Sequence, residues 1–350
     1  MACAPASHTP PMRYSLDPVR AECPACHSNG ASHLHRVGSV QSAQHFARRE
    51  VAPERHEALR DHIEELWGGD ACDVLRCNTC GFGFARPYVA GDARFYDLAY
   101  ERTGYPQARW EFGRTVEALA GVAPGYSLLE VGAGDGAFLR RVVGSLMPPD
   151  RALATEFSEY GRRAIESLGV RAVAADVRSL DGAAPAPFGA VCLFQVLEHL
   201  DGLDELMAHL GALSTPDAHL FISVPNDARI EFSERHGGLL DMPPNHVGRW
   251  TRSAFQFLAK RHGWRLVGHE VEPEGALAKM RELVVYRYMR RRQRGGSLAA
   301  RAERVRPPLV RAAQGAALAA YAVGALPAAA AMVRADGLGG TQWAHLRRRA

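Results

Sequence analysis

From residue 126 onward, short apolar-rich runs alternate with segments whose apolar residues recur at helical spacing. The runs are 128–131, 152–155, 171–174, 189–194, 219–224 and 264–269. Buried strands that alternate with helices are typical of a parallel sheet with helices on both faces. We therefore predict an α/β fold with a doubly wound, mostly parallel sheet.

A glycine-rich turn follows the first of these strands. Gly132, Gly134 and Gly136 separate the strand 128–131 from a helix that we expect to start near Gly136 and to continue through Val143. Such a turn lets a ligand lie against bare backbone, beside the amide N–H groups of a helix N-terminus. The turn is the candidate cofactor site, and a glycine turn without a ligand is the plainer alternative.

The glycine spacing leaves two cofactors open. Residues 132–137 fit the G-x-G-x-x-A form of the dinucleotide fingerprint, and Glu156 lies near the distance at which an acid would hold a ribose. This pattern would suit a nicotinamide-dependent oxidoreductase. Glu130 and Asp135 favour another ligand, because carboxylates there would repel a pyrophosphate. They suit a ligand with an ammonium group and no phosphate, such as S-adenosylmethionine (SAM).

Polar residues stand at the carboxyl ends of the predicted strands. They are Glu130, Glu156, Asp176, Gln195 and Asn226. In a doubly wound sheet, ligands bind at the carboxyl ends of the strands, near the point at which the strand order reverses. The convergence of five polar groups predicts one site at that edge.

Two Cys-x-x-Cys pairs precede the sheet, Cys23 with Cys26 and Cys77 with Cys80. Two such pairs supply four thiolates for a tetrahedral Zn²⁺, and a site closed by four thiolates has a structural role. The pairs are farther apart than in a zinc ribbon, where about 15–20 residues separate them. The apolar spacing between them predicts an inserted helix over 54–67.

The overall composition is that of an ordinary soluble protein. At 350 residues the chain can hold one large core and a small accessory module. The net charge of +4 is too small to indicate nucleic acid as a partner. No continuous apolar run opens the chain, so we expect no secretory signal and, with paired cysteines, a reduced cytoplasmic location.

The C-terminal third departs from the strand and helix alternation. Residues 279–294 are basic with interleaved apolar residues, and 315–333 are uncharged and rich in alanine. We expect helices that pack on the domain or on a second copy of the chain, as in a homodimer. Peripheral membrane contact through 279–333 is the alternative, because arginines beside an apolar surface suit anionic headgroups. Pro327 disfavours a transmembrane helix.

Taken together, the motifs resemble those of class I SAM-dependent methyltransferases. They are Glu130-Val-Gly-Ala-Gly-Asp-Gly136, Glu156, Asp176-Val177, Phe194-Gln-Val-Leu-Glu-His-Leu200 and Ser223-Val-Pro-Asn226. The paired cysteines resemble the zinc-binding leader of a bacterial subset of that family, many of which act on sugars or other natural-product intermediates. The resemblance also implies a seventh, antiparallel strand at 339–346.

The resemblance implies a place for the methionine half of SAM. Gly132 and Gly134, in the Gly-x-Gly-x-Gly pattern that Gly136 completes, would let it approach the backbone. Glu130 would interact with its ammonium group. The backbone at Gln195 would line the same part of the site.

The adenosine half would lie against the ends of the next two strands. Glu156 would accept hydrogen bonds from both ribose hydroxyls, and Phe157 would pack on the adenine ring. Asp176 would face the adenine amino group, while the Val177 amide would reach a ring nitrogen.

The acceptor side has three candidate catalytic residues. His199 and His246 are candidate bases for an acceptor that must lose a proton, and a structural bond to a backbone carbonyl is the alternative for each. Some family members bind a divalent metal through Glu-x-x-Glu-His at the position of Glu198-His199. Gln195 replaces the first acid here and is a poorer ligand for a hard cation. We therefore expect Glu198 to cap or brace the following helix.

These interpretations divide the chain into five parts. They are a disordered leader (1–19), a zinc-binding module with a helical insertion (20–90), connecting helices (91–124), a methyltransferase core (125–275 with 339–349) and a basic, alanine-rich helical insertion (276–338). The predicted function is SAM-dependent methyl transfer to a small-molecule or glycan-intermediate acceptor. The alternatives are a nicotinamide-dependent oxidoreductase and a zinc-bearing SAM-binding protein without catalysis.

Overall fold

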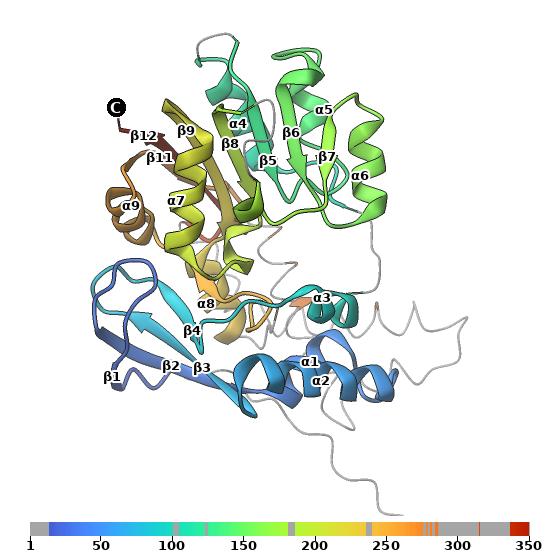
Figure 1. The fold of residues 1–350 in the computed structure, drawn as a ribbon. Helices are drawn as coiled ribbons and strands as arrows, with labels where there is room; N and C mark the ends of the chain where they lie inside the picture. The colour runs from blue at the N-terminus through green and yellow to red at the C-terminus, as the bar shows by residue number, and fades with distance from the viewer. Residues whose placement is uncertain are drawn as a thin grey trace, which may run out of the picture.

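The computed structural model describes residues 14–100, 105–122, 125–180, 186–235, 240–275 and 337–349, together with residues 278, 281, 284, 285 and 315. Two β-sheets organise these residues. In Figure 1 the larger sheet and its helices form the upper part of the molecule, and the N-terminal sheet and its helices form the lower part.

The larger sheet contains seven strands. They are β5 (Leu128–Val131), β6 (Ala152–Thr155), β7 (Arg171–Val173), β8 (Phe188–Phe194), β9 (Ser214–Pro225), β11 (Trp264–Val271) and β12 (Thr341–Arg348). Their order is β11-β12-β9-β8-β5-β6-β7. The strands from β5 to β9 pair in parallel, whereas β12 is antiparallel to both of its neighbours. The predicted doubly wound, mostly parallel seven-stranded sheet is confirmed.

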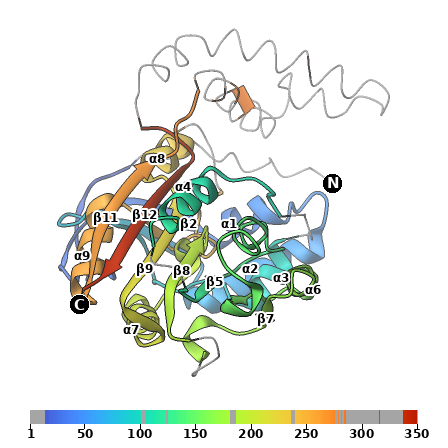
Figure 2. The same cartoon turned by 90° about the horizontal axis from the view of Figure 1, so that it is seen from above.

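Helices cover both faces of this sheet. They are α4 (Trp110–Leu119), α5 (Leu139–Val142), α6 (Glu159–Glu166), α7 (Leu203–Leu213) and α9 (Arg252–Arg261), with short 3-10 turns η1 (Pro149–Arg151), η2 (Val177–Ser179) and η3 (Leu197–His199). Seen from above, α7 and α9 lie along one side of the sheet and α4 along the other (Figure 2).

The strands read as continuous apolar runs because successive residues face two different cores. Leu129 and Leu153 pack in one core with residues of α7 and α9. Leu128 and Ala152 pack in the other with residues of α4, α5 and α6. Both faces of the central strands are therefore buried, which fixes the register of the parallel ladder.

The second sheet is antiparallel. Its strands, in spatial order, are β1 (Pro18–Arg20), β2 (Gly30–Gly38), β3 (Ala71–Cys77), β4 (Gly83–Arg86) and β10 (Gly248–Arg249). The helices α1 (Ser39–Phe46), α2 (Pro53–Trp67) and α3 (Ala93–Ala99) share a core with it. α2 confirms the helix predicted over 54–67. The sequence did not indicate β10, which reaches this sheet from the loop after α8 (Asp227–Arg235).

Two local expectations are wrong. Residues 14–19 are not a free leader, because the Leu16 N–H donates to the His33 carbonyl at 2.8 Å and β1 pairs with β2. The helix expected from Gly136 through Val143 is only the short α5, because Gly136 and Gly144 take positive φ angles and turn the chain at both ends. Residues 1–13 lie outside the described residues.

The predicted C-terminal insertion, 276–338, lies almost wholly outside the described residues. Its flanks are described: the Glu272 N–H donates to the Thr341 carbonyl at 2.8 Å, so the insertion leaves and rejoins the sheet at neighbouring positions. Within the ranges given above, every helix is too short or too polar to cross a lipid bilayer.

A buried ion pair joins β10 of the N-terminal sheet to α8, the helix that follows β9 of the larger sheet. The Arg249 guanidinium on β10 donates to both carboxylate oxygens of Glu234 on α8, at 2.9 and 2.5 Å. The Tyr14 hydroxyl donates to the same carboxylate at 2.7 Å. Both charged groups are buried. Burial opposes the charge on Glu234, but Arg249 beside it lowers its pKa to about 2.

Replacing Arg249 by alanine should destabilise the fold strongly, because it leaves the Glu234 carboxylate buried without its cation. We expect a loss of about 3–5 kcal/mol in the free energy of unfolding, measured by urea denaturation. The control is Arg163→Ala, which breaks the exposed Arg163–Glu159 pair on α6 and should cost less than about 0.5 kcal/mol. Equal losses in the two variants would contradict the role given to Arg249.

The same pair predicts acid sensitivity. The folded pKa of Glu234 is depressed, so its contribution to stability is present above the unfolded pKa of about 4.3 and is lost as the pH falls toward about 2. A double variant, Glu234→Leu with Arg249→Met, should show a flatter dependence of unfolding free energy on pH across that window. Parallel curves for the two proteins would show that the pair does not titrate as proposed.

Candidate functional site

The glycine turn lies at the carboxyl end of β5, next to the ends of β6 and β8. Gly132, Gly134 and Gly136 all have positive φ angles, of 67°, 58° and 78°. A Cβ on Gly132 would lie 2.8 Å from the Val196 side chain, and one on Gly134 would lie 2.9 Å from the Tyr105 ring. The turn therefore needs glycine for its backbone conformation and for the close approach of its neighbours.

Glu156 holds this turn from the end of β6. Its carboxylate accepts hydrogen bonds from the Gly134 N–H at 2.9 Å and from the Ser158 N–H at 2.7 Å. The Tyr105 hydroxyl donates to the same carboxylate at 3.2 Å. Tyr105 was not among the site residues predicted from the sequence, because it belongs to none of the motifs.

Glu130 is a buried acid at the end of β5, and its Oε2 atom has no hydrogen-bond partner among the described residues. Burial raises the pKa of this carboxyl well above its ordinary value, and the nearby carboxylates of Glu156 and Asp135 raise it further. A buried acid without a partner is costly. It would be stabilised by a ligand that brings a positive charge or a donor.

Gln195, directly after β8, has the left-handed φ of 58°. Its side-chain Nε2 is buried and has no hydrogen-bond partner in the described part of the chain. Non-glycine residues rarely adopt this conformation, and such positions cluster at functional sites. The predicted edge therefore contains a second unsatisfied group beside the glycine turn.

The other predicted residues at this edge differ in their exposure and in their hydrogen bonds. Asp176 accepts three hydrogen bonds from Arg178, which lowers its pKa. Val177 is buried at the start of η2, whereas the Phe157 ring is 71% exposed and free to cover a ligand. Asn226 instead holds the start of β12, because its amide donates to the carbonyls of Gly337 and Gly339. The roles of the first three toward an adenosine stay predictions.

Three residues predicted for the acceptor side come together in the structure. Glu198 and His199 belong to η3, which starts three residues after β8, and His246 belongs to the loop before β10. One potential ligand atom from each lies within 4.8 Å of the other two. The two imidazole rings stand edge to face, with centroids 4.5 Å apart.

Each histidine is oriented by a bond from its Nδ1 atom. His199 Nδ1 lies 2.7 Å from the Asn245 carbonyl, and His246 Nδ1 lies 2.9 Å from the Asp241 carboxylate. Because these oxygens can only accept, both Nδ1 atoms carry protons. Burial and the neighbouring His246 lower the pKa of His199 to about 3. Burial opposes the charge on His246, but Asp241 raises its pKa.

Glu198 does not brace the following helix as expected. Neither of its carboxylate oxygens has a hydrogen-bond partner in the described residues, and α7 begins after Gly202 with no side-chain cap. The side chain is 1% exposed, and burial raises the pKa of its carboxyl to about 7. Glu198 instead faces the two histidines.

Two tyrosines from α3 and its C-terminus line this cluster. The Tyr96 hydroxyl lies 2.9 Å from His199 Nδ1, and the Tyr100 hydroxyl donates to the Asn245 side chain at 3.0 Å. Neither tyrosine was among the site residues predicted from the sequence. Phe95 does pack in the core of the N-terminal sheet, but the polar ends of its tyrosine neighbours reach the site.

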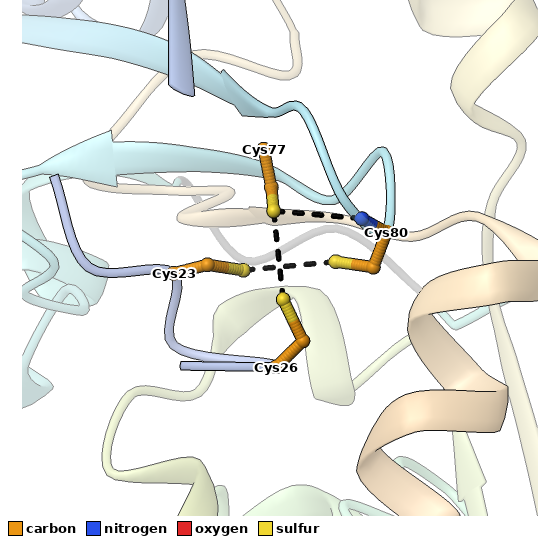
Figure 3. A group of neighbouring side chains, drawn as sticks. All are labelled: Cys23, Cys26, Cys77 and Cys80. Carbon is orange, nitrogen blue, oxygen red and sulfur yellow. Dashed lines mark hydrogen bonds between the residues drawn. The ribbon is translucent and has the colours of Figure 1, made fainter. Parts of the chain in front are cut away.

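The four cysteines of the two Cys-x-x-Cys pairs also converge. Figure 3 shows their side chains pointing toward a common centre from two turns of the N-terminal sheet. The Cys23 and Cys80 sulfurs are 3.7 Å apart, and those of Cys26 and Cys77 are 3.5 Å apart. All four sulfurs lie within 4.8 Å of one another.

The Cys77 and Cys23 sulfurs accept hydrogen bonds, whereas burial raises the pKa of the Cys26 thiol and the bond to Cys23 raises the pKa of the Cys80 thiol. The backbone N–H groups of Thr79 and Cys80 both donate to the Cys77 sulfur. The Cys80 thiol donates to Cys23 and lowers the pKa of that thiol to about 6. Cys72 and Cys192 are buried outside the cluster. The donor set is therefore one that could hold a metal ion.

Comparison with known proteins identifies the family of the chain. A family model described as a methyltransferase domain matches residues 44–269, more than half of the chain. The match includes the glycine turn, the Glu198–His199 segment and the His246 loop. A search of curated proteins finds no match.

Several solved structures are similar to the chain at low sequence identity. A SAM-dependent methyltransferase from Archaeoglobus fulgidus is 16% identical, with 68% of this chain and 92% of that chain covered and a TM-score of 0.43. Phosphoethanolamine N-methyltransferase 2 from Haemonchus contortus, solved with SAM, is 13% identical, with 69% and 53% covered and a TM-score of 0.41. The [4+2]-cyclase SpnF is 15% identical, with 89% and 97% covered and a TM-score of 0.41. These scores are too low to argue for an activity, so the family rests on the matching model.

Proposed function

Because the chain belongs to the methyltransferase-domain family, we propose that it transfers the methyl group of SAM to a small-molecule or glycan-intermediate acceptor. The observation that carries the proposal is the glycine turn at the carboxyl edge, with the unpartnered acid Glu130 beside it. The turn offers bare backbone to a ligand, and Glu130 needs a cationic or donor partner. The methionine half of SAM could lie against the backbone of the turn, and its ammonium group could be the partner of Glu130.

The residues around the turn fit the rest of the cofactor. Glu156 presents a carboxylate at the end of β6, where an acid can accept from ribose hydroxyls. The exposed ring of Phe157 would cover the adenine, with Asp176 and Val177 at its edge. Tyr105 bonds to Glu156 and lies against Gly134, so it would have to adjust as the ligand enters.

When bound, SAM supplies a sulfonium methyl group, which an acceptor lone pair attacks in line as the carbon–sulfur electron pair returns to sulfur. The chain must align the acceptor and exclude water, and these effects can supply most of the acceleration. A hydroxyl or amine acceptor must also lose a proton. Glu198, His199 and His246 form the part of the site that would bind and activate such an acceptor.

The methyltransferase match favours the methyl donor over a nicotinamide cofactor. Glu130 agrees with this choice, since a buried carboxylate beside the glycines would repel a pyrophosphate. A protein that binds SAM without catalysis is the remaining alternative. The buried cluster of Glu198, His199 and His246 favours catalysis, because unsatisfied groups of this kind carry a cost that a purely structural site would have no reason to bear.

For the cysteine cluster, we propose a structural Zn²⁺ held by Cys23, Cys26, Cys77 and Cys80. Four sulfurs bound to one zinc at about 2.3 Å stand about 3.8 Å apart. The sulfur–sulfur separations of 3.7 and 3.5 Å fit that spacing. Four thiolates leave no open position for a substrate, so the ion would stabilise the N-terminal sheet.

SAM or S-adenosylhomocysteine should raise the melting temperature, and Glu156→Ala should abolish the shift, because it removes the acid that holds Gly134 and would hold the ribose. At a concentration of 100 times Kd the ligand would contribute about 2.7 kcal/mol. Thermal-shift assays measure this. The control Glu159→Ala, an exposed acid on α6, should keep the shift.

A shift with NAD or NADP and none with SAM would contradict the proposed cofactor. Transfer itself is tested by mass spectrometry of lysate metabolites incubated with protein and SAM, which should reveal a product that gains a methyl group together with S-adenosylhomocysteine. SAM binding without either product would support the non-catalytic alternative.

Cys77→Ser should lower the zinc content from about one ion per chain to well below one, and it should lower the melting temperature because a ligand of the N-terminal sheet is lost. Elemental analysis and thermal denaturation measure the two effects. Cys72→Ser is the matched control, since Cys72 is buried outside the cluster. Unchanged zinc content in Cys77→Ser would disprove the assignment.

A further inference from the structure

We propose that Glu198, His199 and His246 bind a divalent transition-metal ion, as a site separate from the four cysteines. Two imidazoles and one carboxylate form a known ligand set for Zn²⁺ and Fe²⁺. The three residues come from two distant segments, η3 and the loop before β10, which the fold brings together.

The hydrogen bonds of the two imidazoles leave one nitrogen of each ring available. Because His199 Nδ1 donates to Asn245 and His246 Nδ1 donates to Asp241, the Nε2 atom of each ring is the one available to bind a cation. His199 Nε2 lies 3.9 Å from Glu198 Oε1. That separation is too long for a shared hydrogen bond.

The surroundings of Glu198 provide separate evidence that a cation binds here. It is 1% exposed, and both carboxylate oxygens are without hydrogen-bond partners among the described residues. A buried carboxylate of this kind is strongly destabilised unless a cation or a donor accompanies it. Its nearest polar neighbours in the cluster are two imidazole nitrogens, and an ion between the three groups would satisfy all of them.

The surrounding contacts resemble those of metal ligands. A histidine that binds a metal almost always donates its other N–H to a carboxylate or a carbonyl, which fixes the ring. Asp241 performs this role for His246, and the Asn245 carbonyl performs it for His199. Ligand atoms that share one ion at about 2.1 Å stand about 3 to 3.5 Å apart, so side-chain movements of about 1 Å would close the set.

Gln195 does not contribute to this set. The substitution of an acid by Gln195 made a metal at Glu198 and His199 less favoured from the sequence, but His246 provides a third ligand that no motif around β8 could reveal. Two nitrogen ligands favour a transition metal over Mg²⁺ or Ca²⁺, which prefer oxygen.

Three protein ligands would leave coordination positions open for an acceptor. The His199 side chain is 24% exposed, so the cluster is reachable from solvent. An acceptor oxygen on the ion would have a lowered pKa and could lose its proton to solvent water without a strong base. This use of the ion rests on the proposed methyl transfer, whereas the binding of the ion does not.

The test is a titration of the full-length, zinc-loaded protein with Co²⁺, after labile metal has been removed with a weak chelator. We expect about one further equivalent to bind, with visible d–d bands and no thiolate-to-cobalt charge transfer. Glu198→Gln and His246→Ala should each weaken binding by at least about 100-fold, and Asp241→Asn by about 10- to 100-fold. The control His209→Ala removes a histidine that bonds to the Leu180 carbonyl and should bind as the wild type does.

The isosteric Glu198→Gln variant keeps the test decisive if His246→Ala folds poorly, and the SAM thermal shift reports that its fold is intact. Absence of a cobalt equivalent outside the cysteines in the wild-type protein would overturn the proposal, as would wild-type affinity in Glu198→Gln. Loss of SAM binding in Glu156→Ala would leave cobalt binding unchanged, so failure of the cofactor proposal and failure of the metal proposal are distinguishable.

Discussion

Parallel pairing of β5 with β6 and β8 is the constraint on which the candidate site depends. The register places Glu130 opposite Ala154 and Cys192, so the strands end within a residue or two of the same edge. Apolar residues on both faces hold this register against a shift. The polar groups that follow the strands are therefore brought to one edge of the sheet.

Two carboxylates show how burial shapes this edge. Glu130 and Glu198 are both buried, and each has at least one oxygen without a partner in the described residues. A core built for stability alone would pair or replace such groups. Glu130 belongs to the strand that ends in the glycine turn, and Glu198 lies beside the two histidines. The edge of the sheet therefore has two positions, Glu130 and Glu198, at which a positively charged group would be stabilised. Two such positions suit a reaction between a bound cofactor and a separately bound acceptor.

The sequence predicted the larger sheet well because its signal is local. Apolar runs such as 189–194 are confirmed as strands, and the glycines of the turn fall where the backbone needs positive φ. What it missed depends on contacts between distant segments. Tyr96 meets His199 across 103 positions of the chain, and β10 joins the N-terminal sheet although it follows β9. No periodicity or motif carries such pairings.

The short strand β10 has a consequence for how the two parts of the chain can vary. Gly248 and Arg249 pair with β4, while His246, two residues before Gly248, lies in the cluster with Glu198 and His199. Residues 240–250 therefore contribute both to the N-terminal sheet, through β10, and to the cluster of Glu198, His199 and His246. A chimera that exchanges the N-terminal module alone would pair β4 of another protein with β10 of this chain. A change in that pairing would displace His246, because it lies two residues before β10. A chimera designed to change the acceptor should therefore exchange residues 240–250 together with the N-terminal module.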